Sequence, residues 1–568
     1  MASWLGKPGV DVYEDIQVNV LPLNSAFVIL NTTFDRLGIY SVRDDCYKCP
    51  FEREHAFDSH LDNDYFMVDT KEPYTWRILK SNIKEYLEPD YRGGLICDLK
   101  PPVRGYGVYR LDVGTCGMET VVQPPNPYWS LLLFSAILLS SVIVYGLIRL
   151  FLRRNNEAKY NEGLNLTAIR DNLDIMPSLH FLRGILLILI IFATSGGGGY
   201  PIFLRTFGGL TVAECFFFTY TFSIGLKIPV MFDEETKKTM TKRTVFSKIF
   251  VKSVFFCLLG MVISGTAPRS MHTNISLFAP LPRIAVAYLM AATVYMFAKI
   301  RDPKAKTIVS KAWSNVKTLF WSWVLAVFLV AFMIISIALF YSTKCLLSPE
   351  SELQGNWTSV SESLQCKDDI FGEVFNKNLL SVNRDEVFHV DYYYVFTKGL
   401  MGFVSSILTA LVGLKAGVIY VQETHSDRTK LWHLWAFLLC LAGITLAIMS
   451  RVLSFNLWPI AVVFVLSALS IDFYTLIYFI TEVRKFSSSI ISHCGFASIA
   501  TLAGHLLFSH SFPFFWGESL DTHFFYLYQS SWIVLLWVII TVCWMKWRTF
   551  LINSVVSDEG TRRAILSW

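Results

Sequence analysis

Two ionisable side chains inside apolar segments of the sequence could transfer protons. Glu214 begins the apolar segment that follows the glycine run Gly196–Gly199, and His505 lies in the late part of another, "AGHLLF". An ionisable group in a membrane span costs about 2.5–3.5 kcal/mol on insertion scales, so its presence needs a reason. Glu214 could face a cavity near the outer surface, or it could form a structural ion pair. For His505, hydrogen-bonded packing is the alternative to catalysis.

Other ionisable residues of the apolar segments have a structural explanation. Long basic side chains near a helix end can extend toward the membrane surface, which keeps the charge in water. This explanation suits Arg183, Lys227, Arg283 and Lys398. Lys415 and Asp472 also fall inside apolar segments.

The composition places these residues in an integral membrane protein. The chain has 568 residues, of which 53% are hydrophobic and 17% charged, with a mean hydropathy of +0.44. A soluble chain carries roughly 25% charged residues. The net charge of +5 is spread over short loops, which indicates membrane topology rather than a nucleic-acid partner.

Apolar segments long enough to cross a bilayer occupy most of the chain after residue 127. A spanning helix needs about 20 predominantly apolar residues, and on this criterion we predict about eleven transmembrane helices. The predicted spans are residues 128–148, 183–203, 209–231, 249–266, 281–299, 318–341, 396–420, 431–450, 457–481, 488–508 and 530–546. The fold class is therefore an α-helical polytopic membrane protein. Because glycine disfavours helix, the run Gly196–Gly199 is expected to break a membrane helix.

The loops and the N-terminal part give a topology. Lys and Arg gather in every other loop and in the tail, which marks these as cytosolic and the remaining loops as outside the cytosol. Residues 1–127 show period-two alternation with turn residues between the runs, so we predict a β-sandwich-like domain on the outer, luminal side. Residues 128–546 form the membrane domain, with a long outer loop at 342–395, and residues 547–568 form a cytosolic tail.

Cysteines and glycosylation sequons fit this topology. Six of the 11 cysteines lie on the predicted outer side, an even number that suggests disulfides: Cys46, Cys49, Cys97, Cys116, Cys345 and Cys366. Cys46 and Cys49 form a Cys-x-x-Cys, for which zinc or redox chemistry is the alternative, but no second such pair accompanies it, and we predict no metal site. Outer sequons begin at Asn31, Asn274 and Asn356.

The segment "SLHFLRGILLILIIFATSGGGGYPIFLRTFGGLTVAECFFF" resembles the signature of the heparan-α-glucosaminide N-acetyltransferase family. In that family, Phe-Arg-Gly opens a membrane helix, followed by a glycine run with a tyrosine, a short outer loop and Gly-Leu-Thr-Val-Ala-Asp. The segments "DDCYKCPF", "APLPRIAVAYL", "LVGLKAGVI", "SFNLWP" and "AGHLLFSHSFPF" resemble further family motifs in the same order. The resemblance covers most of the chain.

The resemblance implies a function and a location. Family members are lysosomal membrane enzymes that take acetyl-CoA from the cytosol and acetylate the terminal glucosamine of heparan sulfate in the lumen; the family also suggests a homodimer. Amine attack on a thioester needs a base, and Lys or Arg should hold the phosphates of coenzyme A. By family position, Arg183, His180 and Arg283 would bind the cosubstrate. Membrane lipid and heparan sulfate, or another amino sugar, are the implied partners.

This sequence departs from the family at the catalytic positions. The family's catalytic histidine falls on Leu204 or Arg205, and its asparagine before the glycines falls on Thr194. Neither leucine nor arginine can act as the base. If the chain is active, we predict that base work is done by His505, Glu214 or water, with Thr194 as a hydrogen-bond donor. The alternative is a catalytically silent relative that keeps the fold to bind or scaffold a ligand.

Overall fold

The computed structural model describes residues 12–13, 16–17, 21–44, 51–58, 65–71, 73–80, 86–87, 91–155, 176–204, 211–237, 241–265, 279–298, 307–342, 400–452, 457–486, 488–509, 511–514 and 522–555. The chain divides into two compact units. The first is Met1–Asn172, Ile188–Ala213 and Phe508–Trp568, and the second is Leu173–Leu187 and Glu214–Leu507. Each unit is described by itself.

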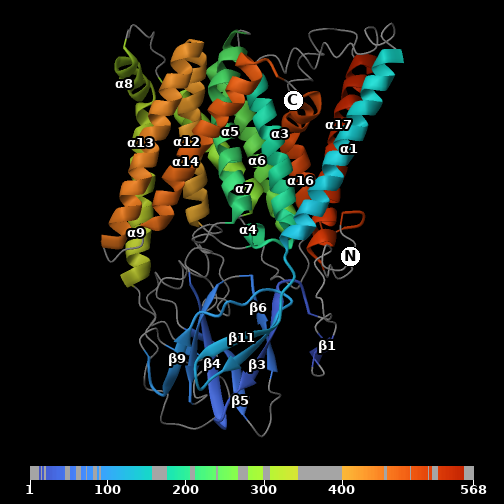
Figure 1. Ribbon diagram of the computed structural model, residues 1–568. Helices are drawn as coiled ribbons and strands as arrows, with labels where there is room; N and C mark the ends of the chain where they lie inside the picture. The colour runs from blue at the N-terminus through green and yellow to red at the C-terminus, as the bar shows by residue number, and fades with distance from the viewer. Residues whose placement is uncertain are drawn as a thin grey trace. The chain divides into compact units, whose positions relative to one another are not determined.

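The first unit contains a sheet domain (Figure 1). Its strands are β1 (Val12–Tyr13), β2 (Ile16–Gln17), β3 (Ser25–Asn31), β4 (Arg36–Arg43), β5 (Phe51–Asp58), β6 (Tyr65–Asp69), β7 (Tyr74–Leu79), β8 (Tyr86–Leu87), β9 (Leu95–Leu99), β10 (Val108–Asp112) and β11 (Gly117–Val122). One sheet has the order β11-β10-β3-β6 and another β8-β5-β4-β7-β9, while β1 and β2 pair separately. Strand β10 runs parallel to β3, and the other pairings are antiparallel.

The two larger sheets share one hydrophobic core. Val28 and Leu111 from one sheet are buried in the same cluster as Ile39 and Trp76 from the other. Burial on alternate positions of β6 shows why the period-two pattern folds this way, since one face meets the core and the other meets solvent. The strand-rich N-terminal region predicted from the sequence is therefore confirmed as a sheet domain.

One disulfide between predicted cysteines is present among the described residues, and glycosylation of the sequons stays a prediction. Cys97 and Cys116 form a disulfide with their Cα atoms 6.3 Å apart. Asn31 ends β3 and is exposed, as a glycan acceptor must be. The remaining predicted cysteines and sequons lie outside the described residues: Cys46, Cys49, Cys345, Cys366, Asn274 and Asn356.

Most of the other described residues form helices (Figure 1). They are α1 (Tyr128–Asn155), α3 (Pro177–Thr194), α4 (Pro201–Leu204), α5 (Val212–Lys237), α6 (Lys242–Gly265), α7 (Pro280–Met296), α8 (Ile308–Thr318), α9 (Phe320–Ser342), α12 (Leu400–Gln422), α13 (His425–Val452), α14 (Trp458–Tyr478), α15 (Ser489–Phe496), α16 (Ser498–Phe508) and α17 (His523–Val555). Helix α14 continues as a π turn, Phe479–Val483. The first unit contains α1, α4 and α17, while α3 and α5 each pass from one unit to the other.

Glycines let helices of the second unit approach closely. A Cβ atom on Gly225 of α5 would lie 1.9 Å from the carbonyl oxygen of Ala410, and one on Gly413 of α12 would lie 2.0 Å from that of Phe222. A Cβ on Gly495 of α15 would lie 1.7 Å from the carbonyl oxygen of His180 in α3. Small residues at crossing points are typical of membrane helix packing, because they bring the two backbones together.

The structure confirms a polytopic membrane protein. Among the described residues, seven helices are long and apolar enough to cross a membrane, and nine if two bent pairs each count as one span. The bent pairs are α8 with α9, at 75°, and α15 with α16, at 78°. A helix lies in each of the eleven predicted ranges. Two apolar helices, α7 and the stretch Tyr128–Ser141 of α1, are shorter than the 18 residues required for this count. Eleven crossings therefore stay a prediction.

The limits of the two predicted spans near the glycine run are wrong. The predicted span 183–203 is the helix Pro177–Thr194, and the predicted span 209–231 begins at Val212. An apolar segment in the sequence can extend across glycine and proline, whereas the helix itself ends where the backbone leaves helical geometry. The expected break at the glycine run is confirmed.

Candidate functional site

A left-handed turn follows α3 at the glycine run. Gly196, Gly197, Gly198 and Gly199 all have positive φ, between 51° and 88°. Residues with a Cβ atom rarely adopt this backbone region, so four glycines in succession are what such a turn requires. The turn is also packed, since a Cβ on Gly198 would lie 2.4 Å from Leu527 and one on Gly196 would lie 2.3 Å from Tyr526.

Side chains from elsewhere in the first unit hydrogen-bond to the backbone of this turn. The Asn24 amide donates to the carbonyl of Gly199 at 3.0 Å, and the Ser530 hydroxyl donates to the carbonyl of Ser195 at 2.9 Å. The Ser530 oxygen also accepts from the backbone N–H of Gly198 at 3.3 Å. Each bond pairs a backbone group that the end of α3 would otherwise leave without a helical partner.

A histidine also lies at the turn. Nδ1 of His523, at the start of α17, lies 3.1 Å from the carbonyl oxygen of Gly198, and its ring stacks on Tyr200 with centroids 4.7 Å apart. A carbonyl oxygen can only accept, so Nδ1 carries the proton and Nε2 of the neutral ring is a proton acceptor. The histidine is 8% exposed.

Sequence reasoning missed His523. The last predicted span begins at residue 530, which places His523 in the loop before it, far along the chain from the glycines. Of the predicted residues, Thr194 ends α3, and its hydroxyl donates to the carbonyl of Ile190 at 2.7 Å. Leu204, one of the two positions aligned with the family's histidine, ends α4, and Arg205 lies outside the described residues.

Arg183 and His180 are both buried on α3 in the second unit. The Arg183 guanidinium donates to the hydroxyl of Ser223 at 3.1 Å and to its carbonyl at 2.9 Å, and the residue is 5% exposed. His180 is 6% exposed, and its Nδ1 makes no hydrogen bond to any described residue. The charges of Arg183 and Lys227 both act on His180. Because serine is neutral, these hydrogen bonds do not neutralise the charge of the buried Arg183, and a bound anion would do so.

Arg283 has different surroundings. It is buried on α7, its guanidinium lies 5.4 Å from the ring centroid of Phe217, and the carboxylate of Glu214 acts on it electrostatically. An electrostatic interaction with a buried cation such as Arg283 is what the structural ion-pair alternative for Glu214 requires. His505 is buried on α16 in the second unit, whereas Thr194 and the glycine turn belong to the first.

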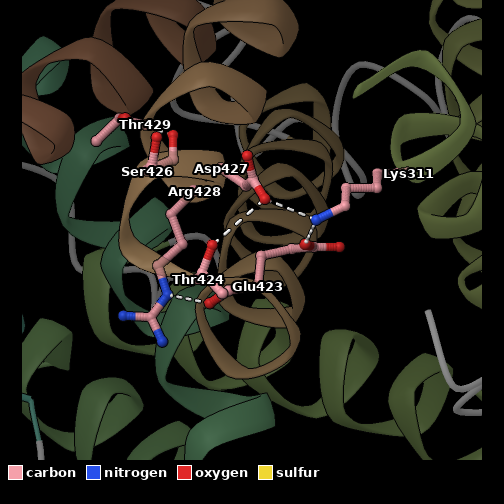
Figure 2. A network of polar contacts seen from close by, with 7 residues as sticks. All are labelled: Lys311, Glu423, Thr424, Ser426, Asp427, Arg428 and Thr429. Atoms are coloured by element: carbon pink, nitrogen blue, oxygen red, sulfur yellow. Dashed lines mark hydrogen bonds and ion pairs between the residues drawn. The ribbon is translucent and has the colours of Figure 1, made fainter. Parts of the chain in front are cut away.

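A polar network surrounds the junction of α12 and α13 (Figure 2). The Lys311 ammonium of α8 lies 2.7 Å from carboxylate oxygens of both Glu423 and Asp427. The Arg428 guanidinium donates to the carbonyl of Glu423 at 2.7 Å. The Glu423 side chain is only 3% exposed, so its charge depends on this compensation.

The network extends through Arg428 to α14 and α3. Arg428 donates to the Tyr478 hydroxyl at 3.3 Å and lies 4.4 Å from the ring centroid of Tyr420. The Tyr420 hydroxyl donates to Glu482 at 3.3 Å, and the Ser178 hydroxyl donates to the same carboxylate at 2.5 Å. In the sequence, Lys311 and Arg428 are two of the basic residues that gather in alternate loops, and nothing there relates them to each other. Within the part of the chain that the structure describes, no cluster of His, Cys, Asp and Glu could hold a metal ion.

Together, the helices, the sheet domain and the glycine turn define a polytopic membrane protein with a sheet domain and a glycine-rich break after one of its helices. The chain is 24% identical over 392 residues to the heparan-alpha-glucosaminide N-acetyltransferase of Mus musculus, covering 65% of this chain and 59% of that protein. It is 24% identical over 391 residues to the protein of that name in Homo sapiens, covering 64% of this chain and 58% of that protein. No protein-family model matches the sequence.

These matches establish a distant relationship to the heparan-alpha-glucosaminide N-acetyltransferases, as the motif order predicted. The match spans less than two thirds of the length of either curated relative.

The network around Lys311 yields a stability prediction. We expect Lys311→Met to lower the thermal unfolding midpoint of the detergent-solubilised protein, because Glu423 would lose its compensating charge. The double variant Lys311→Met/Glu423→Gln should recover part of the loss, since the uncompensated buried charge is gone. Lys317→Met, at an exposed lysine of the same helix, is the matched control. Additive effects of Lys311→Met and Glu423→Gln would contradict the coupling.

Proposed function

We propose that this protein is an acetyl-CoA-dependent membrane acetyltransferase that acylates an amine, in which His523 replaces the family's loop histidine as the general base. The observation that carries the proposal is the imidazole at the glycine turn, whose Nδ1 is engaged by the carbonyl of Gly198. The distant relationship to heparan-alpha-glucosaminide N-acetyltransferases supports the reaction class.

The proposed chemistry follows from the tautomer of His523. Nε2 accepts a proton from the acceptor's nitrogen as that nitrogen attacks the thioester carbonyl. The new C–N bond forms, the C–S bond breaks, and the coenzyme A thiolate leaves and takes up a proton. The Gly198 carbonyl holds the Nδ1 proton and steadies the imidazolium, as the third group of a catalytic triad does.

Arg183 and His180 support the proposed cosubstrate. Coenzyme A carries phosphates, which arginine binds through charge-assisted hydrogen bonds. Arg183 has a serine as its hydrogen-bond partner, and His180 has a buried ring nitrogen with no hydrogen bond to a described residue. We propose both as ligands of the anionic end of acetyl-CoA. Arg283, also predicted to bind the cosubstrate, is the weaker candidate, because Glu214 offsets its charge.

The other assignments are proposals of the same kind. They comprise eleven crossings, a luminal N-terminal domain over residues 1–127, a cytosolic C-terminus, a lysosomal membrane, glycans at Asn31, Asn274 and Asn356, disulfides at the four cysteines outside the described residues, and a homodimer. Heparan sulfate, or another amino sugar, is the proposed acceptor, since the name of the relatives refers to a glucosaminide. Thr194, Glu214 and His505 remain secondary candidates for roles in catalysis.

A catalytically silent relative is the alternative, and the packing of the turn favours it. The positions that Cβ atoms would occupy on Gly197 and Gly198 are filled by Phe203 and Leu527. If the glycine turn serves only this packing, it needs no general base beside it. In that case the fold would bind or scaffold a ligand without acylating it.

The first test uses membranes containing the wild-type chain, labelled acetyl-CoA and glucosamine. We expect transfer above a mock membrane, and we expect His523→Asn to lower it about 10²–10⁴-fold, the usual contribution of a general base. Asparagine can still donate to the Gly198 carbonyl, so the turn should stay anchored while proton transfer is lost.

The control for this variant is His433→Asn on α13, which removes a histidine that pairs with Asp472 instead of the glycine turn. Full activity in a folded His523→Asn protein would refute the assignment of the base. Absence of transfer by the folded wild-type protein would favour the silent alternative.

A second prediction separates the two arginines. We expect Arg183→Met to weaken acetyl-CoA binding by the purified protein about tenfold or more, as loss of a charged hydrogen bond would. Arg283→Met is the matched change at the arginine offset by Glu214, and its effect on binding should be smaller. Equilibrium binding of labelled acetyl-CoA measures both, and the reverse order of effects would contradict the proposal.

A further inference from the structure

A cavity of about 380 Å³ lies among α9, α12, α13 and α14 in the second unit. These four helices are neighbours in the structure (Figure 1). Its walls are aliphatic and aromatic, and Lys415 of α12 is the charged residue that lines it. The volume falls within the range of small-molecule sites.

Lys415 is held by aromatic rings. Its ammonium lies 3.1 Å from the ring centroid of Trp323 and 5.9 Å from that of Trp435. Among the residues described, it has no carboxylate partner, unlike Lys311. Cation–π contacts stabilise an ammonium only partly in apolar surroundings, so an anion in the cavity would complete its coordination.

Two more hydrogen-bond donors accompany the ammonium. The indole N–H groups of Trp323 and Trp435 are shielded from solvent, and neither makes a hydrogen bond within the described parts of the chain. Both residues line the cavity, and their rings lie 5.6 Å apart. Buried donors usually have partners, and a group with several acceptor oxygens would provide them.

The rest of the cavity suits a hydrocarbon chain. Leu408, Val412, Leu439 and Phe464 are among its apolar lining residues. Val327, also in the lining, is 66% exposed at the surface of α9, a helix that forms part of a candidate membrane span. An occupant could therefore enter sideways from the lipid.

We propose that this cavity binds a single-chain fatty acid, with its carboxylate on Lys415 and the two tryptophan N–H groups and its hydrocarbon chain against the aliphatic walls. One positive charge matches one carboxylate, and the mostly apolar lining matches a hydrocarbon chain rather than a sugar or a nucleotide. This site is distinct from the glycine turn and does not depend on the proposed acetyl transfer.

The test measures binding of tritiated oleic acid to the purified full-length protein in detergent, with oleyl alcohol as a competitor of equal chain length. We expect saturable binding and competition by unlabelled oleic acid at a concentration at least tenfold lower than by oleyl alcohol, because the alcohol lacks the charge. Lys415→Gln should weaken binding about tenfold or more, and Lys415→Arg should weaken it less. Ala331→Trp, which fills the cavity from an exposed position on α9, should also weaken binding.

Lys430→Gln is the matched control, because this exposed lysine of α13 does not line the cavity. It should bind oleic acid as the wild type does. Equal competition by the acid and the alcohol, no saturable binding, or wild-type binding by folded Lys415→Gln would each overturn the proposal. If Lys415→Gln does not fold, the comparison of acid with alcohol on the wild-type protein decides.

Discussion

Backbone groups that leave a helix in apolar surroundings must find hydrogen-bond partners, and this constraint shapes the glycine turn. The end of α3 exposes the carbonyls of Ser195, Gly198 and Gly199, which accept from Ser530, His523 and Asn24. The backbone of the turn is left-handed, and only glycine adopts this conformation easily four times in succession. The same hydrogen bond that anchors the turn leaves the other nitrogen of His523 able to accept a proton.

In the second unit, the corresponding constraint is that buried charged side chains need compensating partners. Helices approach closely at Gly225 and Gly413, and charged side chains such as Arg183 and Glu423 are buried. Lys311 is satisfied by two carboxylates, whereas Arg183 has Ser223 and Lys415 has tryptophan rings. Lys311 is thus neutralised by carboxylates of the protein, whereas Arg183 and Lys415 could each bind an anionic ligand. This difference underlies both the proposed cosubstrate site and the proposed fatty-acid site.

Sequence reasoning reached the helical class, the sheet domain and the glycine break, because hydropathy, period-two alternation and glycine propensity are local properties. It missed the true ends of α3, because a count of apolar residues does not detect where a proline begins a helix or where glycines end it. It also missed His523, whose relation to Gly198 spans 325 residues of sequence. The electrostatic interaction of Glu214 with Arg283, and the aromatic surroundings of Lys415, likewise arise from helix packing that no local pattern encodes.

The tautomer of His523 tests the central claim most directly. Histidine-selective ¹⁵N labelling of the protein in lipid, with His523→Asn used to assign the signal, reports which ring nitrogen carries the proton at neutral pH. The account predicts a neutral ring protonated at Nδ1 and a bare Nε2, because the Gly198 carbonyl accepts from Nδ1. A ring protonated at Nε2, or at both nitrogens, would contradict the assignment of His523 as the base.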